Sequence, residues 1–85
     1  MANYKILIKP SAVKELNEIP KRELSKITDR ISSLSTDPRP SGCEKLTAHN
    51  TYRIRQGSYR IIYTIEDDKL IILVIKVGHR RDVYR

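Results

Sequence analysis

The feature of this sequence that most restricts its fold is a series of three β-type segments separated by very short connections. The segments are Tyr52 to Gln56, Tyr59 to Glu66 and Lys69 to Val77, and they are joined at Gly57-Ser58 and Asp67-Asp68. Connections of two residues are typical of antiparallel hairpins. The C-terminal half of the chain is therefore predicted to form a three-stranded antiparallel sheet.

The last of these segments is predicted to be a central strand. Its residues from Leu70 to Ile75 are apolar on both faces and rich in branched side chains. This pattern favours a strand that is covered on at least one side. Another part of the chain must then supply the cover.

The N-terminal half begins with one more strand, followed by a helix. The side chains from Tyr4 to Lys9 alternate with a period of two, which indicates a strand that ends at Pro10. Ser11 is predicted to cap a helix that ends near Pro20. Apolar residues recur at helical spacing on its core side at Val13, Leu16 and Ile19.

A second helix is predicted from Pro20 to about Ser33, before a breaker-rich loop over residues 35–42. The two helices make a hairpin, which we expect to pack on one face of the sheet. The predicted fold class is therefore α+β, in the order N-terminal strand, helical hairpin and three antiparallel strands. The core-facing stripe of the second helix is Leu24, Ile27, Ile31 and Leu34.

Length and charge restrict the kind of protein. The chain has 85 residues, and a common domain has roughly 100 to 150, so residues 1–85 are predicted to form one domain. Lys and Arg number 17 against 10 Asp and Glu, which gives a net charge of +7. This excess indicates a polyanionic partner, with nucleic acid as the first candidate.

Several other classes of protein are disfavoured. Cys43 is the only cysteine, which excludes an intramolecular disulfide and favours a reducing, cytoplasmic location. No apolar stretch approaches the roughly 20 residues that cross a bilayer. His49 and His79 have no metal-binding spacing, and there is no glycine-rich phosphate loop, so we expect neither metal nor cofactor. We assign no role to His49 and interpret the two aspartates at 67–68 as turn residues.

Three arginines are predicted to gather on the sheet face turned away from the helices. Period two places Arg53 and Arg55 on one side of their strand, and Arg60 on the same side of the next strand if the apolar residues face the helices. Like charges on adjacent strands repel each other unless an anion lies between them. For a single arginine, a solvated face is the simpler interpretation. For three arginines beside a basic tail, we interpret the face as an anion site.

The tail, from Gly78 to Arg85, combines groups suited to RNA chemistry. It supplies cationic donors, a histidine of the type that titrates near neutrality, and an aromatic ring that can stack on a base. A terminal charge run is more often a solvated chain end, so composition alone is a weak signal here. The candidate residues are His79, Arg80, Arg81 and Tyr84.

The chain resembles the RelE/ParE toxin superfamily over nearly its full length, and it is more similar to the RelE branch. The residues that carry the resemblance are Lys45-Leu46, Tyr52 to Arg55, Gly57 to Tyr63 and Val77 to Tyr84. The resemblance implies a RelE-like fold with the predicted order of elements. It also implies the toxin of a type II toxin–antitoxin system that acts as an mRNA interferase.

The activity implied by the resemblance is ribosome-dependent cleavage of mRNA in the A-site codon of the 70S ribosome. Arg60 and Arg80 match the family's arginines at the scissile phosphate, and Tyr84 matches its C-terminal tyrosine, which stacks on the substrate or takes a proton from it. The family often has lysines at the positions of Arg53 and Arg55, where a guanidinium, always protonated, can only clamp phosphate. The residues expected to bind RNA are Lys45, Arg53, Arg55 and Arg81.

The expected reaction is metal-free attack of a ribose 2′-hydroxyl on the adjacent phosphate, which gives a 2′,3′-cyclic phosphate and a 5′-hydroxyl. The strand arginines would stabilise the pentacoordinate state. Tyr84 is the first candidate for the general base, from the resemblance, and His79 is the second, from its chemistry. Arg80 would protonate or stabilise the leaving oxygen.

Two alternatives stay open. One is a ParE-like inhibitor of DNA gyrase, against which the grouping of His79, Arg80 and Tyr84 argues. The other is a catalytically inactive protein that binds RNA or the ribosome. A shared scaffold does not decide between these functions. In each toxin interpretation we expect a cognate, acidic, RelB-like antitoxin that wraps the basic surface as an extended or helical segment.

Overall fold

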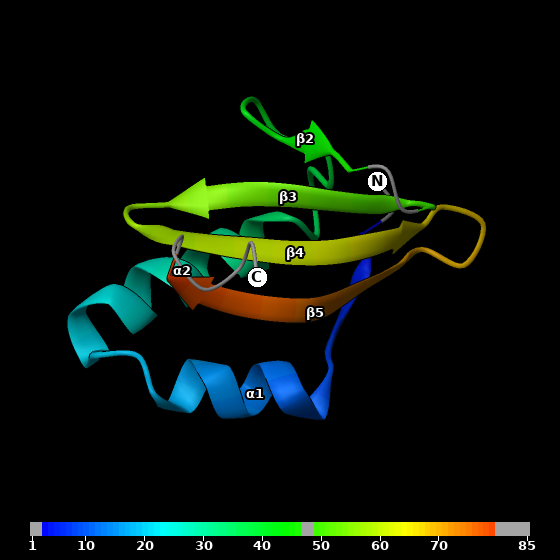
Figure 1. The fold of residues 1–85 in the computed structure, drawn as a ribbon. Coiled ribbons are helices and arrows are strands. Elements are labelled where there is room, and N and C mark those ends of the chain that lie inside the picture. The colour runs from blue at the N-terminus through cyan, green and yellow to red at the C-terminus, as the bar shows by residue number, and fades with distance from the viewer. Residues whose placement is uncertain (1–2, 47–48, 80–85) are drawn as a thin grey trace.

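The computed structural model describes residues 3–46 and 49–79. In this part of the chain, helices α1 (Pro10–Asn17) and α2 (Lys21–Ser33) pack on a five-stranded sheet (Figure 1). The predicted α+β fold is confirmed. The strands, in chain order, are β1 (Lys5–Ile8), β2 (Glu44–Lys45), β3 (Thr51–Gln56), β4 (Tyr59–Glu66) and β5 (Ile71–His79).

The sheet has the strand order β1-β5-β4-β3-β2. Strands β2 to β5 pair in antiparallel fashion, whereas β1 runs parallel to β5, with Lys5 opposite Ile71. Strand β5 thus lies inside the sheet, as predicted, although β4 is the middle strand. Ile72 and Val74 of β5 are fully buried. The helices on one face provide this cover, and in Figure 1 α2 lies behind the sheet.

The two hairpin connections differ. The β3–β4 turn has two residues, as predicted, and its Gly57 has a φ of +61°, which glycine adopts without steric cost. The β4–β5 connection is longer than predicted because the chain turns over residues 67–70, where the amide of Leu70 donates to the carbonyl of Asp67 at 3.4 Å. Strand β5 therefore begins at Ile71, later than the predicted Lys69. It extends past the predicted end at Val77, because His79 still pairs with β4.

Two details predicted for the first helix are wrong. The helix begins at Pro10, with Lys9 at the cap position and no side-chain cap bond from Ser11. Proline has no N–H to satisfy and a φ that suits a first helical turn, so it starts the helix before the serine. Val13 is 41% exposed, and Ala12 is fully buried in its place. The core side of α1 therefore runs through Ala12 and Leu16, four residues apart.

The core lies between the sheet and the helices. The predicted stripe of α2 is confirmed at Ile27, Ile31 and Leu34, which are at most 3% exposed. Leu24 is partly buried against the same cluster. None of the described helices is long and apolar enough to cross a membrane.

Helix α1 packs beside the part of β5 that β1 does not reach. Pairing with β1 ends at Val74 of β5. Beyond it, Glu15 accepts a hydrogen bond from the amide of Val77 at 3.0 Å and lies 3.2 Å from Nζ of Lys76. A partly buried edge amide needs an acceptor. The helix side chain supplies one where no strand continues.

The loop between α2 and β2 is held by what we call the Arg39 cluster, which comprises Arg39, Asp67, Tyr4 and Tyr52. Both terminal nitrogens of Arg39 donate to the Asp67 carboxylate, at 2.8 and 3.2 Å. The Tyr4 hydroxyl donates to the same carboxylate at 2.6 Å, and the guanidinium lies 5.1 Å from the ring centroid of Tyr52. These donors lower the pKa of Asp67, with Arg39 contributing most.

Candidate functional site

The three strand arginines do gather on the sheet face turned away from the helices, and we call them the arginine row (Arg53, Arg55 and Arg60). Arg55 lies directly opposite Arg60 in the β3–β4 register. The neighbouring pair Ile54 and Ile61 points to the opposite face and is fully buried in the core. The alternation predicted for these strands is therefore confirmed.

The members of the row differ in exposure. Arg53 and Arg60 are only 7% and 9% exposed, whereas the side chain of Arg55 is 58% exposed. A buried guanidinium is costly to hold without compensating contacts. Arg55 is the member of the row that is most open to solvent.

Glu44 on β2 is a neighbour of the row that was not predicted from the sequence. It lies opposite Arg53 in the β2–β3 register, and its carboxylate accepts a hydrogen bond from that guanidinium. Its other oxygen lies 3.6 Å from Nη2 of Arg55. One sequence signal was available, because Glu44 is the only acidic residue between Asp37 and Glu66.

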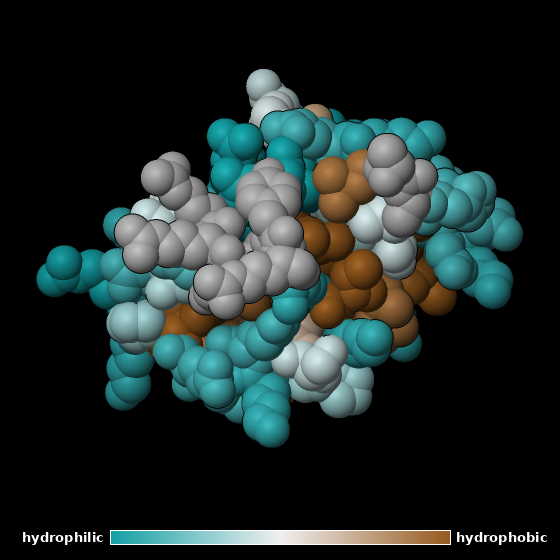
Figure 2. All heavy atoms as spheres, viewed as in Figure 1, coloured by the Kyte–Doolittle hydropathy of each residue, from teal (hydrophilic) through white to brown (hydrophobic). Residues whose placement is uncertain are grey.

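The other half of the same sheet face is apolar. Leu7 of β1 is 40% exposed and lies beside Leu73 of β5, which in turn lies opposite Thr64 of β4. Figure 2, viewed toward this face, shows hydrophobic residues grouped beside hydrophilic ones. The face thus offers cationic donors at one end of β4 and an apolar contact surface at the other.

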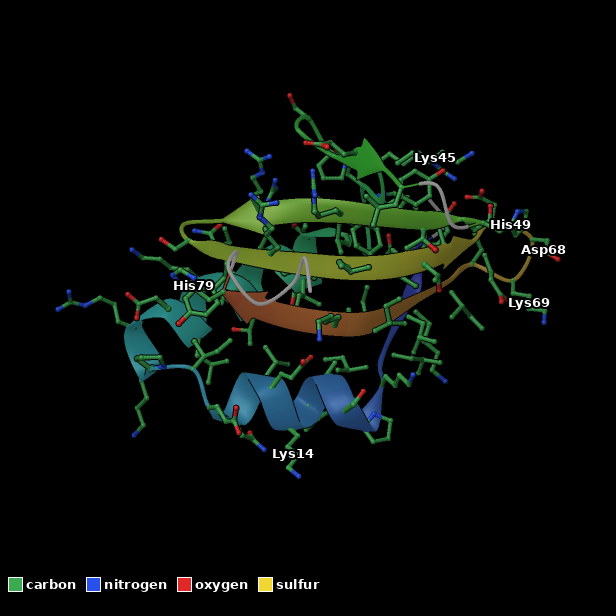
Figure 3. The ribbon with its side chains drawn as sticks, in the orientation of Figure 1. Lys14, Lys45, His49, Asp68, Lys69 and His79 are labelled. Carbon is green, nitrogen blue, oxygen red and sulfur yellow. The ribbon has the colours of Figure 1, made fainter. Side chains whose placement is uncertain are left out.

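Two residues predicted for the site lie away from the row. His79 is opposite Tyr59, so it points to the helix side of the sheet, and the two rings meet edge to face at 5.7 Å between centroids. Lys45 is opposite Tyr52, which places it on the same helix side. Figure 3 shows Lys45 and His79 in separate regions. Both side chains therefore point away from the sheet face that carries the arginine row.

His79 instead borders a cavity of about 410 Å³ between the start of α2 and the β3–β4 turn. Glu23 and Lys26 of α2 and Tyr59 of β4 also line it. The cavity lies on the opposite side of the sheet from the arginine row. It therefore does not join the anion site.

The remaining predicted site residues, Arg80, Arg81 and Tyr84, lie outside the described residues. Their roles stay predictions. Within residues 3–46 and 49–79, no group of three or more His, Cys, Asp or Glu side chains is arranged to hold a metal ion. The chemistry available from the described residues is therefore anion binding by guanidinium groups, with one carboxylate beside them.

Comparisons with known proteins agree with this fold. Residues 6–84 match the family model described as the ParE toxin of the type II toxin–antitoxin system parDE. The toxin RelG of Mycobacterium tuberculosis is 29% identical over 96% of this chain and 97% of its own length.

Solved structures give the same result. The toxin–antitoxin complex RelBE2 of Mycobacterium tuberculosis contains a chain with a TM-score of 0.83 at 27% identity, which covers 96% of this chain and 97% of that one. In the archaeal RelE–RelB complex of Pyrococcus horikoshii OT3, the TM-score is 0.84 at 27% identity, over 94% and 98% of the two chains. This chain therefore belongs to the RelE/ParE family of type II toxin–antitoxin toxins.

Proposed function

We propose that this toxin is a ribosome-dependent endoribonuclease that cleaves mRNA in the A-site codon without a metal ion. The observation that carries the proposal is the arginine row, in which Arg55 lies directly opposite Arg60 on the open sheet face. Guanidinium groups pair with phosphate oxygens through two parallel hydrogen bonds. The names RelG and RelE among its relatives support the RelE-like activity.

In the proposed reaction, the ribose 2′-hydroxyl attacks the adjacent phosphate, and the arginine row stabilises the added negative charge. Tyr84 takes the proton of the 2′-hydroxyl, the bond from phosphorus to the 5′-oxygen breaks, and Arg80 stabilises or protonates that oxygen as it leaves. Tyr84 stays the first candidate for the base, and the direction of His79, toward the helix side of the sheet, disfavours the second candidate. This chemistry takes place in the cytoplasm, where ribosomes are.

The proposed partner is an acidic, RelB-like antitoxin. Several solved relatives are toxin–antitoxin complexes, including RelBE2 and the archaeal RelE–RelB complex. The open face of this chain combines the arginine row with an apolar half around Leu7 and Leu73, and the net charge is +7. A segment with apolar and acidic side chains would complement both halves.

The test is primer extension on a defined messenger in a reconstituted translation reaction. We expect cleavage within the A-site codon on programmed ribosomes and none on naked RNA. Arg60→Ala should slow cleavage by about 10²-fold or more, because a fixed donor to the transition state is lost. Full-length messenger at every toxin concentration would reject the proposal.

A second candidate function is inhibition of DNA gyrase, which the ParE description of the matching family model favours. A supercoiling assay separates the two functions. Inhibited supercoiling together with intact messenger would establish the ParE-like activity. Ribosome binding without cleavage and without gyrase inhibition would indicate an inactive RNA-binding toxin.

A further inference from the structure

Glu44 presents both oxygens of its carboxylate to the arginine row. One of its oxygens accepts a hydrogen bond from Nη2 of Arg53, and the other lies 3.6 Å from Nη2 of Arg55. Two oxygens of one anionic group thus face two guanidiniums from the same side of β3. Two oxygens of a phosphodiester would face them in the same way.

The two contacts of this carboxylate are unequal. The side chain of Arg53 is 8% exposed, so its contact with Glu44 is shielded from water. The side chains of Arg55 and Glu44 are 58% and 52% exposed, and at 3.6 Å their contact is longer than a hydrogen bond. Exposed ion pairs of this kind are weak. The Arg55 contact is therefore the one that an incoming anion replaces.

The carboxylate also reduces the electrostatic repulsion between the arginines of the row. Arg55 and Arg60 are directly opposed across two strands. Like charges in that arrangement destabilise the sheet and favour side-chain positions in which the guanidiniums move apart. A nearby negative charge reduces this repulsion while the RNA is absent.

We propose that Glu44 is a positioning residue for the reaction under Proposed function, on which this inference rests. In the RNA-free protein, its carboxylate substitutes for the substrate phosphate and holds Arg53 and Arg55 in their binding geometry. When RNA binds, a phosphate takes over the contact with Arg55, and Glu44 stays on Arg53. Glu44 therefore weakens RNA binding and increases the rate of the bound complex.

The experiment compares Glu44→Gln with Glu66→Gln. Both remove one negative charge from a half-exposed side chain of the same sheet, but Glu66 lies at the far end of β4, with an oxygen 3.6 Å from Nζ of Lys69. The glutamine at position 44 keeps an oxygen that can accept from Arg53. The probe is a short fluorescein-labelled single-stranded RNA, whose affinity is measured by anisotropy over a series of salt concentrations.

Glu44→Gln should bind the RNA about fivefold more tightly at low salt, and its salt slope should steepen by about 0.7, the value for one more neutralised phosphate on a single strand. Glu66→Gln should change the affinity less than about twofold, since its charge is screened from the row. On programmed ribosomes, Glu44→Gln should lower both KM and kcat. A merely structural role would lower kcat without tightening binding.

Equal affinities and salt slopes for the two glutamine variants would overturn the inference, and so would weaker RNA binding by Glu44→Gln. Circular dichroism checks the fold. If Glu44→Gln does not fold, Glu44→Asp replaces it, because aspartate keeps the charge but is too short to face both arginines. In this variant kcat should fall while the salt slope stays native. A native kcat would overturn the inference. A native chain that binds RNA but cleaves no messenger rejects the proposed function alone.

Discussion

Two arginine clusters lie at opposite ends of β4, and they differ in how their charge is balanced. In the Arg39 cluster, one guanidinium is matched by one carboxylate through two hydrogen bonds, with two tyrosines around the pair. In the arginine row, Glu44 accepts a hydrogen bond from the largely buried Arg53 and lies 3.6 Å from the exposed Arg55. The contacts of Arg39 are hydrogen bonds, whereas the contact of Arg55 with Glu44 is longer than a hydrogen bond and leaves the guanidinium open to solvent.

This difference separates a structural arginine from a functional one better than exposure does. The side chain of Arg39 is 43% exposed, close to the 58% of Arg55, yet its donors are already directed at Asp67. An arginine whose partners lie within the chain fixes a loop. An exposed arginine with a long carboxylate contact, as in Arg55, can still bind an external anion.

The largest expected effect comes from removing the exposed member of the arginine row. Arg55→Ala should slow cleavage on ribosomes by about 10²-fold, because one donor to the transition state is lost. Its free energy of unfolding should change by less than about 0.5 kcal/mol, since the side chain is exposed. Single-turnover cleavage and urea unfolding measure the two quantities.

Arg39→Ala is the matched variant and should behave in the opposite way. It should lose about 1 kcal/mol of stability, the upper range for an exposed ion pair with good geometry. Cleavage per folded molecule should stay within about twofold of native, since no bound phosphate contacts Arg39 in the proposed mechanism. Equal losses of cleavage in the two variants would break the distinction between the clusters.

A smaller effect is expected from Tyr63→Phe, which tests whether the loop before β2 is purely structural. The fully buried Tyr63 donates its hydroxyl to the carbonyl of Pro38 at 2.8 Å and lies 3.3 Å from Sγ of Cys43. Burial raises the pKa of Tyr63, so the hydroxyl stays a donor. Its loss should cost about 1 to 2 kcal/mol of unfolding free energy and leave cleavage unchanged.

Tyr4→Phe is the control for that measurement. It removes an exposed hydroxyl that donates to Asp67 at 2.6 Å. The expected loss of unfolding free energy is much smaller than for Tyr63→Phe, because water replaces an exposed partner. If Tyr4→Phe lost as much unfolding free energy as Tyr63→Phe, burial would not explain the difference expected between the two hydroxyl contacts.

The smallest expected effect is a change in acid sensitivity from Asp67→Asn. The Arg39 and Tyr4 hydrogen bonds lower the pKa of Asp67 in the folded state. The stability they contribute is therefore fully present above the unfolded value of about 3.9 and is lost as the pH falls through the lower folded value. The asparagine variant should show a flatter decline in stability below about pH 5. If urea unfolding showed the same decline of stability below about pH 5 in the variant as in the native protein, the lowered pKa of Asp67 would be contradicted.

The parts of the fold that the sequence predicts are those set by local patterns. The tight turn at Gly57 and the alternation of β3 and β4 determine the register that brings Arg55 opposite Arg60. The parallel pairing of β1 with β5 was not predicted, because alternation identifies a strand but not its distant partner. Strand β2 has two residues, too few to show a period.

The candidate site was predicted in part for the same reason. Period two predicts the side of the sheet on which the arginine row lies. The predicted strand ends at Val77, so it gives no direction for His79, which lies in β5 in the structure. Glu44 and Arg53 are joined only through strand pairing, nine positions apart in the chain. Such a contact leaves no local pattern.

The most direct test of the central claim is cleavage of a messenger whose A-site codon lacks its 2′-hydroxyl groups. The native toxin is added to ribosomes programmed with an all-ribose messenger or with one carrying 2′-deoxy sugars in that codon, and the product ends are identified. We predict a 2′,3′-cyclic phosphate and a 5′-hydroxyl from the first messenger and no cleavage of the second. Cleavage of the deoxy codon, or a product with a 5′-phosphate, would contradict the account.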